Sequence, residues 1–244
     1  EISRRARSLG TENAFVVLAE VNALARQGKD IVSFCIGQPD FPAPDNVQEA
    51  AIRAIKGGKH GYTPSAGIDE LRSAAARYLA SVRGGLPIRA EDVVVGAGAK
   101  PFIAYAILST TDYGAGDEVI YPNPGFPIYE SVIKFTGATP VPLPLLEKDG
   151  FGFSAEAVLS RITPKTRLLL INSPCNPTGA AYTAAEWRAL GDVLLKHPRI
   201  VIGTDDMYEK IYWGSEPFTS LLTVVPELYD RTVTINGVSK AYAM

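Results

Sequence analysis

The sequence contains few of the residues from which metal sites and disulfide frameworks are built. Among its 244 residues there are two cysteines and two histidines. Cys35 and Cys175 are far apart and form no C-x-x-C motif, which fits a reducing, cytoplasmic compartment and argues against a thiolate metal site. His60 and His197 are equally isolated. We therefore predict neither a metal site nor a Ser-His-Asp triad.

Long apolar runs and an excess of charge of one sign are also missing. The apolar stretches are far shorter than the roughly 18 to 20 residues that a membrane-spanning helix needs, and the N-terminal EISRRARSLG has no apolar signal region behind its arginines. The 24 basic and 26 acidic residues nearly cancel, and no five like charges follow one another. This balance argues against nucleic acid or a membrane surface as a partner and favours a small-molecule ligand.

Apolar residues are abundant, and they follow two alternating patterns. They make up 46% of the chain, enough for a sizeable core. Helical spacing and end signals predict helices near 15–26 and over 46–56, 69–82 and 183–196. Five short aliphatic or β-branched runs predict strands: DVVVG, DEVIYP, RLLLIN, RIVIGTD and TVTIN. Continuous apolar strands that alternate with helices indicate an α/β fold, with a parallel sheet covered on both faces.

The first 44 residues have a different character. A predicted helix is followed by DIVSFCIGQPDFPAP, whose prolines are typical of a linker. We expect residues 1–44 to form an N-terminal arm and part of a smaller domain, and residues 45–244 to form the main α/β body.

Polar or glycine-rich segments stand where four of the predicted strands end. In VVVGAGAKP, the Gly98-Ala99-Lys100 turn precedes a helix expected to begin at Pro101, so its backbone amides suit a phosphate. The segment matches neither a dinucleotide fingerprint nor a Walker A loop, and an ordinary tight turn is the alternative.

The other three segments offer side chains. Asp205, Asp206 and Tyr208 follow one strand, where an acidic pair suits chemistry or, alternatively, caps a helix. Asn176 lies between two prolines in INSPCNPTG, a pattern that aims a side chain or simply makes a rigid surface turn. Lys240 follows TVTIN in a turn, and by itself a lysine there is an ordinary solvated charge.

Taken together, these segments resemble a known family. The ordered motifs GQPDF, YTPSAGIDELR, GAGAK, GDEVIYPNPGFPIY, NSPCNPTG, DDMYEKIYW and NGVSKAYAM resemble fold-type I pyridoxal-phosphate enzymes, specifically the class I/II aminotransferases. The resemblance covers essentially the whole sequence. It implies a mainly parallel seven-stranded sheet sandwiched by helices, incomplete here, with part of a smaller domain.

The resemblance also implies the roles of the central side chains. Lys240 would form the Schiff base with pyridoxal 5'-phosphate, which requires an amine that can lose its charge. Asp205 would pair with the pyridine nitrogen of the ring and keep it protonated. Asn176 and Tyr208 would hydrogen-bond the phenolic oxygen of the ring, and Phe126 would stack on its face.

Further positions match the family at the phosphate and the substrate. Gly98, Ala99 and Lys100 would bind the phosphate through backbone amides, and Tyr62 would reach it from the neighbouring subunit of a homodimer. Gly37 would present its backbone to the substrate carboxylate, together with Asn176. Some relatives carry a phosphate-binding hydroxyl three residues before the lysine; this chain has Gly237 there, so Ser239 is the nearest substitute.

The family continues past the lysine turn, whereas this sequence stops at Met244. The family's next segments are a G-x-R-x-G motif, a strand that enters the sheet, and most of the small domain. We therefore expect an incomplete chain with an open slot between the VVVG and TVTIN strands. A buried strand edge without partners costs free energy, because each unpaired polar group costs about 1 to 3 kcal/mol.

The function implied by the resemblance is transfer of an amino group between an L-amino acid and a 2-oxo acid, in two half-reactions of a ping-pong mechanism. A C–S β-lyase or cyclising lyase on the same scaffold is the nearest alternative, because it shares Lys240, Asp205, Asn176 and Tyr208. A ligand-sensing regulator fused to a DNA-binding module is another, although no basic recognition helix precedes GQPDF. The chain could also be an inactive cofactor-binding fragment.

Overall fold

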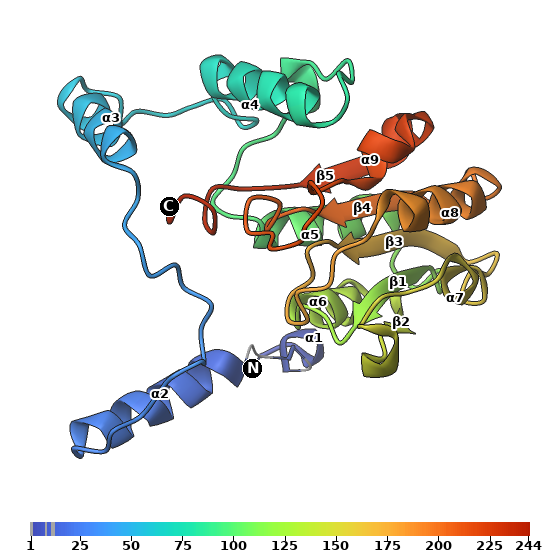
Figure 1. Ribbon diagram of the computed structural model, residues 1–244, viewed down its shortest axis with the longest axis horizontal. Helices are drawn as coiled ribbons and strands as arrows, with labels where there is room; N and C mark the ends of the chain where they lie inside the picture. Colours follow the sequence, from blue (N-terminus) through green and yellow to red (C-terminus); the bar gives the residue numbers. More distant parts are fainter. Residues whose placement is uncertain (1, 8, 11–12) are drawn as a thin grey trace.

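A parallel five-stranded sheet forms the centre of the computed structural model, which describes residues 2–7, 9–10 and 13–244 (Figure 1). Its strands lie in the order β2-β1-β3-β4-β5, and every neighbouring pair is parallel. The strands are β1 Glu118–Asn123, β2 Thr139–Pro144, β3 Thr166–Asn172, β4 Val201–Asp205 and β5 Thr232–Ile235. The predicted α/β class is confirmed, and four of the five predicted strand segments appear as β1, β3, β4 and β5.

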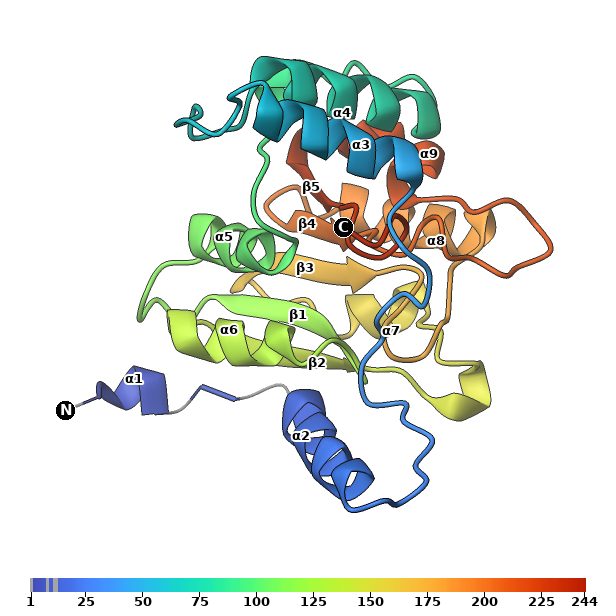
Figure 2. The same ribbon diagram turned by 90° about the vertical axis from the view of Figure 1, so that its left-hand side faces the viewer.

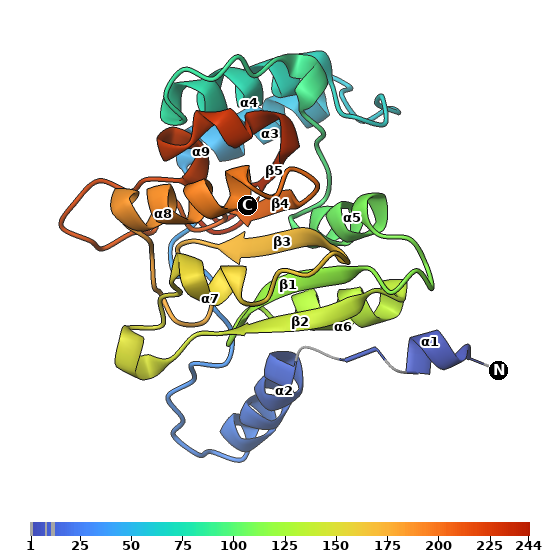
Figure 3. The same cartoon turned by 90° about the vertical axis from the view of Figure 1, so that its right-hand side faces the viewer.

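Helices cover both faces of the sheet. On one face lie α5 and α6 (Figure 2), and on the other lie α7, α8 and α9 (Figure 3). The α-helices are α1 Arg4–Arg7, α2 Asn13–Arg26, α3 Asp45–Lys56, α4 Asp69–Val82, α5 Lys100–Thr110, α6 Ile128–Thr136, α7 Ala155–Leu159, α8 Ala184–Leu195 and α9 Leu221–Val224. Three 3-10 turns complete the described elements: η1 Ala90–Asp92, η2 Glu147–Asp149 and η3 Pro226–Arg231. The helices predicted from spacing are present within two residues of their expected ends.

The buried strand β3 divides the hydrophobic core into two layers. Leu168 and Leu170 face the core under α5 and α6, whereas Leu169 and Ile171 face the core under α7, α8 and α9. Successive side chains of a strand point to opposite faces, so a strand covered on both sides is apolar at every position. This explains why RLLLIN shows no alternation of apolar and polar residues.

Strand β2 lies at one edge of the sheet and was not predicted, because three of its six residues are prolines. The amides of Thr139 and Leu145, which flank these prolines, donate to the carbonyls of Asp117, just before β1, and of Asn123, its last residue. Pro140, Pro142 and Pro144 occupy the alternate positions, where a backbone amide would point away from β1. An edge strand tolerates proline there because no ladder hydrogen bond is lost.

The prediction of a strand over DVVVG is wrong. Residues 93–96 have no regular structure, and the amide of Val95 donates instead to the carbonyl of Ala66, at 2.9 Å. A β-branched run forms a strand only beside another strand, and among the described residues β5 pairs with β4 alone. The two segments therefore do not pair with each other, as expected from the open slot.

The helices before η1 lie at the two ends of the sheet. In Figure 1, α2 lies beyond the β2 edge, whereas α3 and α4 lie beyond the β5 edge. No helix in the described ranges is long and apolar enough to cross a membrane. The proposed division at residue 44 stays a prediction.

Candidate active site

A cavity of about 1130 Å³ lies at the carboxyl ends of the central strands. The loops after β1, β3 and β5 contribute Phe126, Asn176 and Lys240 to its lining, and the last residue of β4 contributes Asp205. The start of α5 and the segment 35–37 line it as well. Ligands of parallel α/β sheets bind at this edge, so the fold brings the predicted side chains to the expected place.

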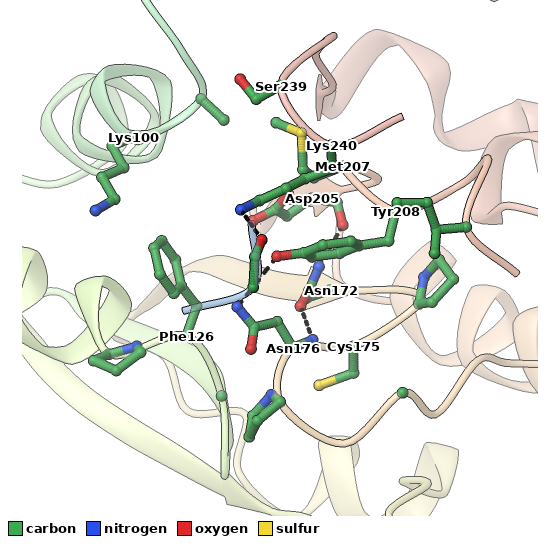
Figure 4. A pocket seen from close by; sticks show the side chains of 18 of the residues that line it. Lys100, Phe126, Asn172, Cys175, Asn176, Asp205, Met207, Tyr208, Ser239 and Lys240 are labelled. Atoms are coloured by element: carbon green, nitrogen blue, oxygen red, sulfur yellow. Dashed lines mark hydrogen bonds between the residues drawn. The ribbon is translucent and has the colours of Figure 1, made fainter. Parts of the chain in front are cut away.

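Lys240 occupies the turn after β5, as predicted, and extends into the cavity (Figure 4). Its Nζ donates a hydrogen bond to the backbone carbonyl of Gly37, at 2.9 Å. A Cβ added to Gly37 would meet no atom within 4 Å. The Gly37 backbone is therefore open on its Cβ side, and the predicted lysine and glycine contact each other across 203 residues of sequence.

Asp205 ends β4 and is almost fully buried, with 8% of its surface exposed. Its Oδ2 accepts a hydrogen bond from the Tyr129 hydroxyl at 2.7 Å, whereas its Oδ1 has no hydrogen-bond partner among the described residues. Burial raises the pKa of the Asp205 carboxyl, and the hydrogen bonds from Tyr129 and the Met207 amide oppose that rise. An unpaired buried carboxylate oxygen is costly, so this atom is suited to a hydrogen-bond donor on a ligand.

No helix begins at the aspartate pair. Residues 207–210 form a turn, so the alternative in which Asp205 or Asp206 caps a helix does not hold. The two side chains also differ in direction. Asp205 lines the cavity, whereas Asp206 is bound to Arg83 of the α4 end at 2.7 Å and does not line it.

Asn172 joins the ends of β3 and β4 to the following loop. Its Nδ2 donates to the Asp205 carbonyl at 2.7 Å, and its Oδ1 accepts the Asn176 amide at 2.6 Å. Asn176 in turn donates from Nδ2 to the Tyr208 hydroxyl at 3.2 Å. The side chains of Asn176 and Tyr208 therefore meet in the cavity, where Figure 4 shows them beneath Lys240.

The glycine turn before α5 lies at the start of a helix that lines the cavity. Gly98 has a φ of +85°, a conformation that glycine adopts without strain, and α5 begins at Lys100 with Pro101 in its first turn. The amides at the helix start carry partial positive charge, and Gly98, Ala99 and Lys100 line the cavity; the Gly98 amide itself donates to the Gly96 carbonyl at 3.0 Å. An added Cβ at Gly96 would lie 2.9 Å from the far end of the Phe102 ring, so a larger residue there would displace that ring.

Two aromatic rings accompany the Lys100 side chain. Its Nζ lies 5.4 Å from the centroid of the Phe126 ring and 5.8 Å from that of the Phe15 ring. The Phe126 ring contacts Tyr129 edge to face, with 5.9 Å between centroids. Phe126 thus presents an aromatic face to the cavity beside a cationic side chain (Figure 4).

The remaining predicted residues differ in their placement. Ser239 lines the cavity next to Lys240. Tyr62 is fully exposed on the segment between α3 and α4 and does not line the cavity of its own chain. The described residues contain no group of three or more histidine, cysteine or acidic side chains placed to hold a metal ion.

Sequence reasoning missed Tyr129 and did not assign a role to Asn172. Tyr129 is completely buried and has the helical spacing of a core residue. Only the hydrogen bond from its hydroxyl to Asp205 distinguishes it from other core residues. Asn172 gave a weak signal, since it is the polar end of an otherwise apolar strand.

Comparison with known proteins places the chain in a family. The family Aminotransferase class I and II matches residues 29–244. A relative from Rhizobium leguminosarum bv. phaseoli, named probable aspartate/prephenate aminotransferase, is 42% identical over 228 residues, which are 93% of this chain and 56% of that protein. A relative from Rhizobium meliloti, named aspartate aminotransferase, is 39% identical over 240 residues, 98% of this chain and 58% of that protein.

Two solved structures agree in fold. The crystal structure of the Rhizobium meliloti aspartate aminotransferase is 38% identical in sequence, with a TM-score of 0.93. The match covers 100% of this chain and 60% of the Rhizobium chain. The structure of the Thermus thermophilus aspartate aminotransferase with maleate is 37% identical, with a TM-score of 0.92. That match covers 100% of this chain and 62% of the Thermus chain. This chain thus spans about 60% of the length of that Rhizobium structure. The predicted resemblance is confirmed: the chain belongs to the class I and II aminotransferase family.

Proposed function

We propose that the protein is a pyridoxal-phosphate-dependent aminotransferase, which moves an amino group between an L-amino acid and a 2-oxo acid in a ping-pong mechanism. The observation that carries this proposal is the unpaired, buried Oδ1 of Asp205 in the cavity that Lys240 also enters. A buried anion and an amine at the carboxyl ends of neighbouring parallel strands are what a pyridine ring and its aldehyde require.

The described residues fit this cofactor. Asp205 Oδ1 lacks a donor, and the ring nitrogen would supply one. The α5 start and the Gly98 turn would hold the phosphate through backbone amides. Phe126 would contact the ring face, and Asn176 and Tyr208 would reach the phenolic oxygen of the ring.

When bound, pyridoxal phosphate supplies an electron sink that stabilises negative charge at the substrate Cα. Asp205 would keep a proton on the ring nitrogen, because its anion is more stable beside a cation than alone in a buried site. Lys240 Nζ would move the proton from the substrate Cα to C4′ of the cofactor, as the family resemblance implies. Its present partner is the carbonyl of Gly37, the residue proposed to face the substrate carboxylate, and this contact supports the role.

The substrate class follows from the relatives by analogy. The curated relatives above carry aspartate in their names, and one also carries prephenate. We propose an acidic amino donor, for which the Lys100 ammonium in the cavity lining would provide a counter-charge. A homodimer, with Tyr62 completing the neighbouring site, and a cytoplasmic location belong to the same proposal. The full exposure of Tyr62 is consistent with a role outside its own chain.

The reaction can be tested with a panel of amino acids and 2-oxo acids, using the protein expressed from its full gene. An aminotransferase converts aspartate and 2-oxoglutarate into a second amino acid and a second 2-oxo acid. Release of ammonia and pyruvate from a β-substituted amino acid, without a second amino acid, would identify a β-lyase. If neither product forms and no cofactor binds, the proposed function is wrong.

A further inference from the structure

The turn after β4 has two faces with different partners. Asp205 and Tyr208 face the cavity, whereas Asp206 and Glu209 face a single buried arginine, Arg83, at the carboxyl end of α4. The same Nη2 atom of Arg83 donates to Asp206 Oδ2 at 2.7 Å and to Glu209 Oε2 at 2.5 Å. The two site residues are thus interleaved with the two anchor residues in a five-residue segment.

This cluster is buried and hydrogen-bonded, although Nε of Arg83 has no hydrogen-bond partner among the described residues. Arg83 and Asp206 are each 3% exposed, and Glu209 is 7% exposed. Tyr78, one turn earlier on α4, also donates its hydroxyl to Glu209. The partners are separated by more than 120 residues of sequence, so the cluster fixes α4 against the loop that carries Asp205 and Tyr208.

Two carboxylates share one cation here, and their titration behaviour differs. Burial raises the pKa of Asp206 to about 7, although the charge of Arg83 opposes the rise. Burial also acts to raise the pKa of Glu209, but the Tyr78 hydrogen bond and the Arg83 charge lower it overall. When Asp206 is protonated and Glu209 is ionised, the cluster with Arg83 has no net charge. A neutral cluster has the lowest free-energy cost of burial.

Stability alone is a poor reason for such a cluster. Replacing a buried ion pair with apolar residues of similar volume is often neutral or stabilising, because burial of charges is costly. What a cluster of this kind supplies is a defined orientation. That matters here because residues 207–210 form an irregular turn and no helix or strand fixes their side chains.

We propose that Arg83 is a positioning residue: through Asp206 and Glu209 it orients the turn so that Asp205 and Tyr208 hold their places in the cavity. This inference rests on the proposed function for its catalytic consequence, since Asp205 and Tyr208 are expected to bind the cofactor ring. Arg83 itself does not line the cavity.

The test compares three variants of the protein expressed from its full gene. Arg83→Met leaves two buried carboxyl groups without their cation. The triple variant Arg83→Met/Asp206→Asn/Glu209→Gln removes all the charges of the cluster and so removes the electrostatic penalty. Arg53→Met is the matched control, because Arg53 forms an exposed ion pair with Glu49 on α3, outside the cavity lining.

The readouts are the thermal unfolding temperature and the affinity for pyridoxal phosphate, followed by quenching of tryptophan fluorescence; Trp213 lines the cavity. We expect Arg83→Met to lower both. The triple variant should regain much of the lost unfolding temperature, because it has no unpaired buried charge. It should still bind the cofactor at least about tenfold more weakly than the wild type, because the hydrogen bonds that orient the turn remain absent. Arg53→Met should behave as the wild type.

Wild-type affinity in the triple variant would overturn the proposal and leave the cluster a purely structural feature. The crystal structure of the cofactor-free triple variant gives a second, independent criterion. The proposal predicts that the hydrogen bond between Tyr208 and Asn176 is lost or lengthened, and an unchanged bond contradicts it. If the wild type binds no cofactor at all, the proposed function fails, and this structural criterion still decides the role of Arg83.

Discussion

The hydroxyl of Tyr129, on α6, donates a 2.7 Å hydrogen bond to Asp205, at the end of β4. Both side chains are buried, and burial together with the Asp205 charge raises the pKa of Tyr129 well above its usual value. Tyr129 therefore stays a neutral donor. It satisfies one oxygen of the carboxylate, and the other has no hydrogen-bond partner among the described residues, so Tyr129 supports the proposed cofactor contact although it does not line the cavity.

Tyr129→Phe should destabilise the ionised form of the Asp205 carboxyl. The substitution removes the donor to Oδ2, and burial then raises the pKa of Asp205 further. A hydrogen bond to a charged group contributes about 1.5 to 3 kcal/mol, so we expect a loss of about ten- to a hundredfold in transamination rate. Steady-state kinetics over a range of pH would measure it. Tyr182→Phe, at a buried tyrosine in the opposite core layer, is the control, and equal rates for the two variants would contradict the prediction.

Lys240 should be the residue that carries the cofactor. Borohydride reduction of the loaded protein is expected to attach the cofactor irreversibly to Lys240, and peptide mapping by mass spectrometry would locate it. Lys240→Ala should still bind the cofactor through the other residues but should not turn over. An adduct found on Lys100, the other lysine that lines the cavity, would show the assignment to be wrong.

The two adjacent aspartates should behave differently. Asp205→Ala is expected to lower the transamination rate by orders of magnitude, since each 1.4 kcal/mol of lost barrier stabilisation is about tenfold in rate. Asp206→Asn should have a much smaller effect, because its amide oxygen still accepts the hydrogen bond from Arg83. Rates are compared per mole of folded protein, as judged by circular dichroism. Equal losses in both variants would remove the special role of Asp205.

Asp206 should also make stability depend on pH in an unusual direction. Its pKa is raised to about 7 in the folded protein from 3.8 in a free side chain, so between these values the folded state holds a proton that the unfolded state has lost. The contribution of Asp206 to the free energy of unfolding is therefore present in full below about pH 4. It falls as the pH rises to about 7, by at most about 1.4 kcal/mol per pH unit.

Urea unfolding of the wild type and of Asp206→Asn at several pH values would isolate this term. The difference in unfolding free energy, wild type minus variant, should decrease between pH 4 and pH 7 and then level off. A difference that increases over this range would mean that the Asp206 carboxyl is stabilised as an anion by Arg83 more strongly than burial opposes it.

The sequence was informative where local chemistry decides the structure. The helix spacing, the capping box at Thr183 and Glu186 and four of the predicted strands depend on neighbouring residues, and the structure contains them all. The residues predicted around Lys240 and Asp205 also meet in one cavity, because the carboxyl ends of parallel strands share one edge.

Long-range partnership could not be predicted in the same way. The VVVG run has the composition of a strand, but no strand lies beside it among the described residues. No sequence pattern indicated the contacts of Tyr129 and Arg83, because the hydrogen-bond partner of each lies more than 70 residues away in the sequence. Strand β2 was hidden by prolines that are acceptable only at an edge, and a position in the sheet order cannot be recognised from spacing.

The prolines of β2 make the two borders of the sheet chemically unequal. At the β2 border, three of six residues have no amide hydrogen to offer, so another extended chain would find carbonyl acceptors but few donors. The β5 border, Thr232–Ile235, contains no proline and keeps its full set of backbone groups. Exposed strand borders recruit further strands, which leads to intermolecular association when the recruited strand is foreign. A strand added to the sheet should therefore pair with the β5 border, and proline at Thr234, whose amide points away from β4, would be the substitution that prevents it.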